Sequence, residues 1–223
     1  MWYNASEVYE QLYANHGYHA NVDFSHGKEI ARKIVYERPN IKSVLDVGCS
    51  HGYAVKVFWN SGVKASGVDI SKSAIMLAFK THGNDLSNCV GKACFQIGSA
   101  TDLPFASQSF DAIMSTEVLE HLMPRDIDTM AREFTRVARN ALFLKIAGHR
   151  EANVASLLHL RNTSNRFKHV KQLHTTVRKT PFWKDAFRRQ GWVVDSNLRH
   201  SEMWERNEIS AGNSVLYFVR RHF

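Results

Sequence analysis

The stretch VLDVGCSHG, residues 44–52, decides the fold class. Residues 43–47 are a run of strand-forming side chains that ends at Gly48, and helical spacing begins directly afterwards, over 53–60. Glycine suits this junction because the chain must turn sharply and let a ligand approach its backbone. The helix that follows offers unpaired amide hydrogens at its N-terminus. The stretch therefore predicts a strand, a ligand-binding loop and a helix, in that order.

Two further strands lead into acidic residues that suit a nucleoside. Residues 65–70 are expected to form a strand, and Asp69 in GVDIS (67–71) follows the glycine loop by about 20 residues. An acid at that position can accept hydrogen bonds from both ribose hydroxyls. Residues 93–97 form the next expected strand and lead into GSATDLPF (98–105), where Asp102 can accept a hydrogen bond from an adenine amine.

Strands and helices continue to alternate along the chain. Strands are expected at 110–115, 141–147, 192–198 and 214–220, and helices at 71–82, 117–137, 154–160 and 180–190. Ser71 is expected to cap the first of these helices and Thr180 the last, with Pro181 in its first turn and Gly191 after its end. Right-handed βαβ units then predict an α/β, Rossmann-like, doubly wound sheet of seven mostly parallel strands, with an antiparallel strand at one edge.

The composition is that of one ordinary globular domain. The chain has 223 residues, 44% of them hydrophobic, and a formal net charge of +8. Residues 145–223 hold 15 basic and six acidic side chains, so the positive charge lies in the last third. The three cysteines, Cys49, Cys89 and Cys94, form no CxxC motif, which predicts free thiols and a cytoplasmic location. No apolar run is long enough for a membrane span, and no secretory signal is expected at the start.

From about residue 41 to 147 the chain resembles the class I methyltransferases that use S-adenosylmethionine. The matching motifs are VLDVGCSHG, GVDIS, GSATDLPF and SFDAIMSTEVLEHL (109–122). An NAD-type Rossmann domain fits less well, because the third glycine of its fingerprint is absent. The family usually has glycine where Ser50 stands, so a less open backbone angle is expected there. The resemblance implies cofactor contacts from Asp46, Gly48, Ser50, Gly52, Asp69, Ile70, Ala100, Thr101, Asp102 and Glu117.

The same resemblance divides the chain by role within a single domain, 1–223. Residues 1–40 are expected to form an N-terminal helical lid, 41–147 the cofactor-binding core, and 148–223 the acceptor side and closing strands. Asp46 is expected near the methionine end of the cofactor, with the glycine loop as its cradle. Cys49 and His51 are expected merely to pack or to face solvent.

A divalent-metal site is a second expectation. Glu117, Glu120 and His121 have i, i+3 and i+4 spacing, which is one face of a helix at the ligand-binding edge of the sheet. Together with His174 they resemble metal-dependent branches of the family, the small-RNA 3′-terminal ribose methyltransferases and the quinone-pathway O-methyltransferases. The resemblance implies Mg²⁺ or Mn²⁺ on these four residues, with Glu120, His121 and His174 as catalytic groups. The alternative is that the acids only stabilise a helix start.

The basic last third bears on the acceptor. Its cations alternate with Phe167, Phe182, Trp183 and Phe187, as in nucleic-acid binders, but helical spacing of the last three favours a core role. HTTVRKTPFWKDAFRRQGW (174–192) resembles the tail of methyltransferase domains that accompany glycosyltransferases. O-methylation of a sugar hydroxyl in a glycan or other small molecule is therefore expected. RNA ribose 2′-O-methylation, quinone-type O-methylation and a catalytically inactive cofactor-binding regulator are the alternatives.

Overall fold

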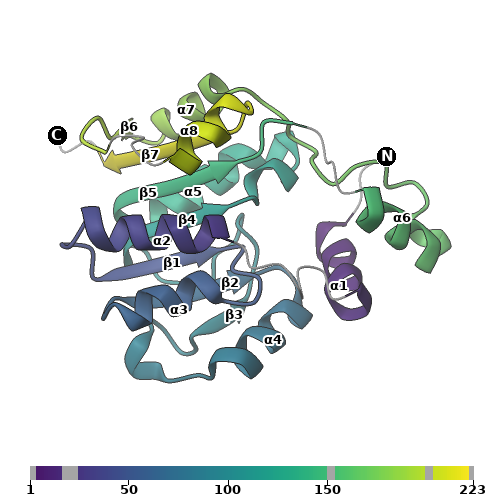
Figure 1. Ribbon diagram of the computed structural model, residues 1–223, viewed down its shortest axis with the longest axis horizontal. Helices are drawn as coiled ribbons and strands as arrows, with labels where there is room; N and C mark the ends of the chain where they lie inside the picture. The colour runs from purple at the N-terminus through teal and green to yellow at the C-terminus, as the bar shows by residue number, and fades with distance from the viewer. Residues whose placement is uncertain (1–3, 17–24, 150–153, 199–202, 221–223) are drawn as a thin grey trace.

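The computed structural model describes residues 4–16, 25–149, 154–198 and 203–220. They form a seven-stranded sheet in the order β3-β2-β1-β4-β5-β7-β6 (Figure 1). Strands β1 to β5 are parallel, and β7 runs antiparallel to both of its neighbours, one place in from the edge strand β6. The predicted Rossmann-like α/β sheet is confirmed. The strands are β1 (Ser43–Val47), β2 (Lys64–Asp69), β3 (Phe95–Ile97), β4 (Phe110–Thr116), β5 (Ala138–Ile146), β6 (Trp192–Val194) and β7 (Ser214–Arg220).

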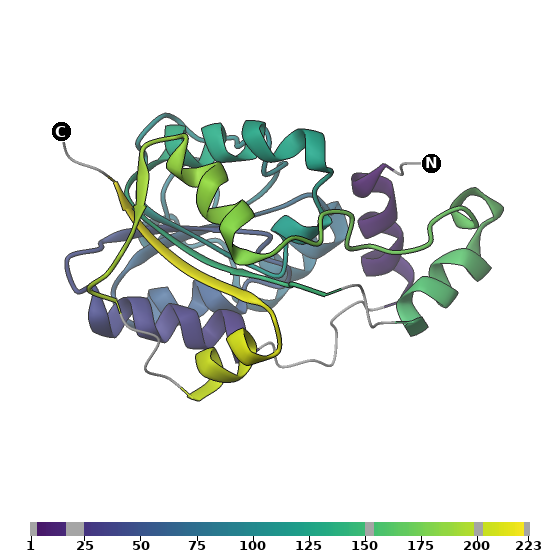
Figure 2. The same ribbon diagram turned by 90° about the horizontal axis from the view of Figure 1, so that it is seen from above.

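Helices cover both faces of the sheet and one end of it. On one face lie α5 and α7, and on the other α2, α3 and α8, while α1 and α6 stand beyond the carboxyl ends of the parallel strands (Figures 1 and 2). The α-helices are α1 (Ala5–His16), α2 (Ser25–Glu37), α3 (Tyr53–Asn60), α4 (Lys72–His82), α5 (Ile127–Val137), α6 (Val154–Thr163), α7 (Thr180–Arg188) and α8 (Met203–Ser210). Short 3₁₀ turns are η1 (Leu86–Asn88), η2 (Leu119–His121), η3 (Pro124–Asp126) and η4 (Asn165–Phe167).

Three hydrophobic clusters hold these layers together. One joins α5 and α7 to the sheet and includes Phe134, Trp183 and Phe187. The second joins α2, α3 and α4 to the opposite face. The third is separate and small: α1, α6 and the segment around η4 bury Val8, Leu160 and other side chains against one another. The apolar side chains of α1 therefore pack on the acceptor-side segment and not in the two larger clusters.

The long helix expected over 117–137 is wrong in its first half. Glu117 adopts a left-handed backbone conformation, with φ 58°, which ends β4 without starting a helix. The 3₁₀ turn η2 follows, and Pro124 then starts η3, because proline lacks the amide hydrogen that a continuing helix needs. The regular helix α5 begins only at Ile127. Glu117 and Glu120 therefore do not share a helix face.

The closing segment also differs from expectation in detail. Thr180 does not cap α7: Lys179 is the N-cap residue, and the Thr180 hydroxyl contacts Ser214 Oγ at 2.9 Å. Strand β6 stops at Val194, where Asp195 turns away to pair with Arg38. Helix α8, which sequence spacing did not indicate, occupies part of the connection before β7. Ser71, by contrast, caps α4 as predicted, accepting from Ala74 N at 3.2 Å.

The expectation of three free thiols is corrected. Cys89 and Cys94 form a disulfide between residues on either side of a tight turn, and Cys49 is a buried free cysteine. Spacing alone missed the pair because four residues separate the two cysteines and the loop between them brings their side chains together. Within the described residues, none of the helices combines the length and apolar character that a bilayer crossing requires.

Truncating Phe134 tests the core between α5 and the sheet. The side chain is fully buried beside Phe187, so Phe134→Ala leaves a cavity and is expected to lower the free energy of unfolding by roughly 3–5 kcal/mol. Tyr36→Ala is the control, because that ring is 87% exposed. Its expected effect is within about 0.5 kcal/mol. If urea unfolding gave the two variants equal losses of unfolding free energy, the assignment of this core would be contradicted.

Candidate active site

A cavity of about 630 Å³ opens at the carboxyl ends of β1, β2, β4 and β5. This volume is in the range of small-molecule sites, and the edge is where open parallel sheets bind ligands. The loops after these strands form its floor, Tyr9 and Tyr13 of α1 border it from outside the sheet, and the turn after α8 closes one end. Segments from both halves of the chain therefore build one cavity.

The β1–α3 loop is held tightly against the end of β2. Gly48 N and Cys49 N both donate to the Val68 carbonyl, at 2.8 and 3.0 Å. Gly48 has φ 79°, and a Cβ there would lie 2.1 Å from Val118 Cγ2. Only glycine can therefore occupy position 48 while Val118 packs against it.

Ser50 has a left-handed backbone conformation, although its side chain was expected to disfavour one. Its φ is 50°, so the loop is left-handed at this position despite the serine. Its Oγ is buried with no hydrogen-bond partner among the described residues, and Ser50 lines the cavity. A buried hydroxyl without a partner is costly, which suits a site that a polar ligand completes.

Asp69 organises the loop end of β2. Its carboxylate accepts from Ser50 N at 3.0 Å and from Ser71 N at 2.9 Å, which ties the loop to the start of α4. Burial raises its pKa to about 6. Burial, and then the negative charge of Asp69, raise the pKa of Asp46 to about 7. Two buried carboxylates therefore stand at one wall of the cavity.

Helix α1 is fastened across this cavity by Glu10. The carboxylate accepts from Ser71 Oγ at 2.8 Å, Ser73 N at 3.0 Å and Ser73 Oγ at 2.6 Å. Partial burial acts to raise the pKa of Glu10, but the hydrogen bonds from Ser73 and Ser71 hold it below its ordinary value. An acid at the start of α4 also suits the positive end of that helix.

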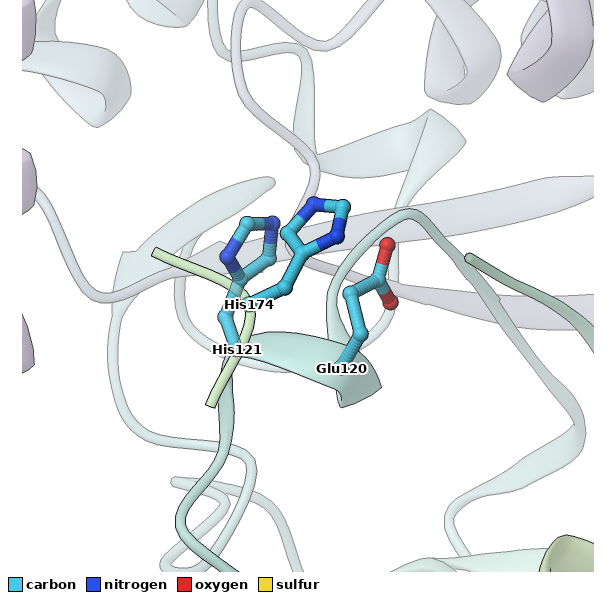
Figure 3. A group of neighbouring side chains, drawn as sticks. All are labelled: Glu120, His121 and His174. Carbon is cyan, nitrogen blue, oxygen red and sulfur yellow. The ribbon is translucent and has the colours of Figure 1, made fainter. Parts of the chain in front are cut away.

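Glu120, His121 and His174 converge beside the same cavity. Their ligand atoms lie within 4.8 Å of one another, and Figure 3 shows His174 joining the two neighbours from a separate segment. Glu120 is fully buried. Tyr9 Oη lies 2.6 Å from His121 Nδ1. His174 Nδ1 lies 2.7 Å from the His149 carbonyl oxygen, which can only accept, so Nδ1 carries the proton and neutral His174 has its lone pair on Nε2.

Glu117 stands apart from this group. Its carboxylate forms an ion pair with Lys145, whose ammonium is also 3.1 Å from Glu208 Oε2. The left-handed backbone at Glu117 turns it toward the end of β5, where its amide donates to the Lys145 carbonyl at 2.9 Å. Of the four residues expected at the metal, the structure brings together Glu120, His121 and His174.

The structure places some of the residues expected at the cofactor in the cavity and others outside it. Those that line the cavity are Asp46, Gly48, Ser50, Asp69, Ile70, Ala100 and Glu117. Gly52, Thr101 and Asp102 are not among the lining residues. A Cβ on Gly52 would lie 2.5 Å from Phe95, so this glycine serves packing. Asp102 is exposed, and its amide donates to the Ser99 carbonyl at 3.0 Å.

Several lining residues were not predicted from the sequence, among them His51, Tyr9 and Tyr13. His51 is buried and lines the cavity, although it was expected to pack or to face solvent. Burial, and then the neighbouring His82, lower its pKa. Its ring is 5.7 Å from that of Tyr13. His51 lies inside the loop motif and could have been proposed there, whereas Tyr9 and Tyr13 come from a distant segment without a motif.

The chemical groups that line the cavity suit S-adenosylmethionine. A buried carboxylate, Asp69, stands at the position expected for ribose hydroxyls, and the glycine cradle leaves no Cβ at Gly48. The Ser50 hydroxyl lacks a protein partner among the described residues. The cavity wall nearest the loop is acidic and would repel a pyrophosphate. These features therefore suit a nucleoside without a pyrophosphate.

Replacing Gly48 tests the cradle. Gly48→Ala places a methyl group against Val118, so S-adenosylhomocysteine affinity is expected to fall at least about tenfold. Gly62→Ala is a matched control, since Gly62 has a similar φ of 73° but nothing within 4 Å of its Cβ position. That variant carries only the backbone cost, about 1–2 kcal/mol of stability. Unchanged affinity in a folded Gly48→Ala protein, measured by calorimetry, contradicts the cradle.

The two buried aspartates predict a pH-dependent stability. Both have raised pKa values in the folded protein, about 7 for Asp46 and about 6 for Asp69, so the folded state binds more protons than the unfolded chain above their ordinary pKa. Their contribution to stability is present at low pH and is lost as pH rises through these values. In urea unfolding across this pH range, the free energy of unfolding of Asp46→Asn is expected to fall less with rising pH than that of wild type. Asp126→Asn, a partly exposed control with 41% of its side chain accessible, should follow wild type, whereas a steeper decline in Asp46→Asn contradicts the assignment.

Comparisons with known proteins agree on the class. Residues 45–143 match the family model of a methyltransferase domain. The O-methyltransferase resE of Aspergillus sclerotiorum is 37% identical over 105 residues, 47% of this chain and 38% of that protein. The erythromycin 3''-O-methyltransferase of Saccharopolyspora erythraea is 38% identical over 85 residues, 37% of this chain and 27% of that protein. The matches thus span well under half the length of these relatives.

Solved structures match along nearly the whole chain. A chain of the complex between the Haloferax volcanii Trm112 methyltransferase activator and the putative methyltransferase covers 100% of both chains, with a TM-score of 0.63 and 17% identity. Magnesium protoporphyrin IX methyltransferase from Synechocystis with bound SAH covers 96% of this chain and 99% of that one, with a TM-score of 0.64 and 15% identity. Residues 45–143 are therefore similar to a methyltransferase domain, and the chain has the fold of the class I S-adenosylmethionine-dependent methyltransferases.

Proposed function

We propose that this protein transfers the methyl group of S-adenosylmethionine to a hydroxyl group, with a sugar hydroxyl as the acceptor. The observation that carries the proposal is the convergence of Glu120, His121 and His174 beside the cavity that holds the nucleoside cradle. An aliphatic hydroxyl is a weak nucleophile at neutral pH and needs such a group to accept its proton. Relatives named O-methyltransferases support the same reaction class.

The chain's own residues would bind and orient the two substrates. Asp69 would accept hydrogen bonds from the ribose hydroxyls, and the Gly48 loop would lie along the cofactor. The sulfonium supplies an electrophilic methyl group when the cofactor is bound. Alignment of the acceptor oxygen with that methyl group would provide a large part of the rate, as in other displacement reactions between held partners.

His174 suits the task of accepting the acceptor's proton. Its Nδ1–H is held by the His149 carbonyl, so Nε2 is the nitrogen that would accept a hydroxyl proton or bind a metal ion. His121 is oriented in turn by Tyr9 Oη at 2.6 Å and by the Leu173 carbonyl at 3.2 Å. Fixed imidazoles of this kind are typical of both general bases and metal ligands.

A divalent ion, Mg²⁺ or Mn²⁺, is the proposed partner of Glu120, His121 and His174. The donor set of one carboxylate and two imidazoles fits such an ion, and its nitrogen content favours Mn²⁺. A bound ion lowers the pKa of a coordinated hydroxyl group. Vicinal sugar hydroxyls could bind it at two points, which supports a sugar acceptor. In the absence of an ion, the histidines would act as the base.

Three of the four aromatic residues that could have favoured RNA are part of the protein interior, and the fourth, Phe182, is partly buried against the same core. Phe167, Trp183 and Phe187 are all buried, so they offer no stacking surface for bases. The fold by itself does not specify methyl transfer, since the [4+2]-cyclase SpnF matches with a TM-score of 0.57. Turnover therefore has to be measured directly.

Removing the metal or Glu120 tests the proposal. Methyl transfer to hydroxylated sugar acceptors is expected to be lost in EDTA, restored by Mn²⁺ and absent in Glu120→Gln, while S-adenosylhomocysteine still binds. Calorimetry with Mn²⁺ is expected to detect an ion in wild type but not in His174→Ala. His169→Ala, an exposed histidine nearby, is the control and should bind the ion normally. Full turnover in EDTA would exclude the metal, and transfer confined to amines or RNA would exclude the sugar hydroxyl.

A further inference from the structure

Four polar side chains from separate elements form one end of the cavity. They are Glu117 after β4, Lys145 near the end of β5, Glu208 on α8 and Asn213 in the turn before β7, and all four line the cavity. We name this group the acceptor wall. It lies outside the motifs that resemble the cofactor site, apart from Glu117.

Contacts within the acceptor wall hold its side chains in place. Lys145 Nζ pairs with Glu117 and lies 3.1 Å from Glu208 Oε2, and Asn213 Nδ2 donates to the same oxygen at 2.5 Å. Asn213 Oδ1 accepts from Gly148 N at 2.8 Å. Preorganised polar groups of this kind favour a ligand of matching shape and charge.

Helix α8 is anchored independently of the cavity. Tyr217 donates to the fully buried Glu205, and Lys33 Nζ lies 3.5 Å from Glu205 Oε2. This contact between α8, β7 and α2 keeps Glu208 at the cavity, one turn further along the helix. The acceptor wall is therefore a rigid part of the fold.

The acids that line the cavity outnumber its lysine and arginine side chains, although the chain as a whole is basic. Its acidic lining residues are Asp46, Asp69, Glu117 and Glu208, and Lys145 is the sole lysine or arginine among the described lining residues. Both carboxylates of the acceptor wall engage that ammonium. At the acceptor wall itself a phosphate would meet two carboxylates and a cation already neutralised by them, so like-charge repulsion opposes its binding when no metal ion is bound in the cavity.

We infer that the acceptor wall binds an uncharged, polyhydroxylated acceptor and rejects a phosphorylated one. Carboxylates are acceptors with several lone pairs, so Glu117 and Glu208 can still accept hydrogen bonds from hydroxyl groups while paired with Lys145. A phosphate has no such protons to donate when it is fully ionised. The inference rests on the proposed function, because it describes the acceptor end of that same site.

Binding of matched sugars to the protein saturated with S-adenosylhomocysteine tests this inference. The probes are glucose, galactose, mannose and rhamnose, the phosphates of these sugars, and glucosamine as a cationic probe, all followed by ligand-observed NMR. At least one neutral sugar is expected to bind, and its phosphate about tenfold more weakly. A phosphate or glucosamine that binds more tightly than every neutral sugar overturns the inference, as does the absence of neutral-sugar binding.

Glu208→Gln tests whether the charge of the acceptor wall, and not only its shape, selects the acceptor. The variant removes one counter-ion of Lys145, so affinity for the neutral sugar is expected to fall and affinity for its phosphate to rise. Asp185→Asn, an exposed acid on α7, makes the same charge change away from the cavity and should leave both affinities unchanged. If Glu208→Gln does not fold, the more exposed Glu117→Gln replaces it. Variants that match the control overturn the inference, whereas failure of S-adenosylhomocysteine to bind wild type overturns the proposed function itself.

Discussion

The carbonyl oxygen of Val68 is the point on which the site depends. It accepts from both Gly48 N and Cys49 N, and the next residue, Asp69, accepts from Ser50 N and Ser71 N. The loop after β1, the end of β2 and the start of α4 are thereby one unit. Because a side chain at position 48 would collide with Val118, the same loop also fixes the turn that leads into Glu120 and His121. The nucleoside cradle and the proposed catalytic group are thus joined through direct packing.

Helix α1 links these two halves from outside the sheet. Glu10 binds the start of α4, next to Asp69, and one residue earlier Tyr9 contacts His121. The helix also packs on α6 and the segment around η4, and that segment leads into His174. Helix α1 therefore contacts both the cofactor half of the chain, through α4, and the segment proposed to bind the acceptor.

The sheet could be predicted because each of its first strands is followed by a local signal, a glycine, an acid or a cap, that needs no distant partner. Gly48 and Asp69 were found in this way, and Ser71 was identified as the cap of α4. What could not be predicted depends on tertiary partners. The turn at Glu117 is set by its ion pair with Lys145 on the next strand. The acceptor wall needs α8, whose anchor is the buried Glu205 contact with Tyr217. Tyr9 reaches the site only because α1 packs on distant segments.

The net charge of +8 belongs to the surface of the last third and not to the cavity, whose described lining holds one lysine and four acids. A crystal structure with S-adenosylhomocysteine and Mn²⁺, with anomalous scattering recorded for the metal, tests the central claim most directly. The nucleoside is expected in the cavity, with its ribose hydroxyls on Asp69 and an anomalous peak between Glu120, His121 and His174. A nucleoside bound away from Asp69, or a saturated crystal without a peak among those three side chains, would contradict that claim.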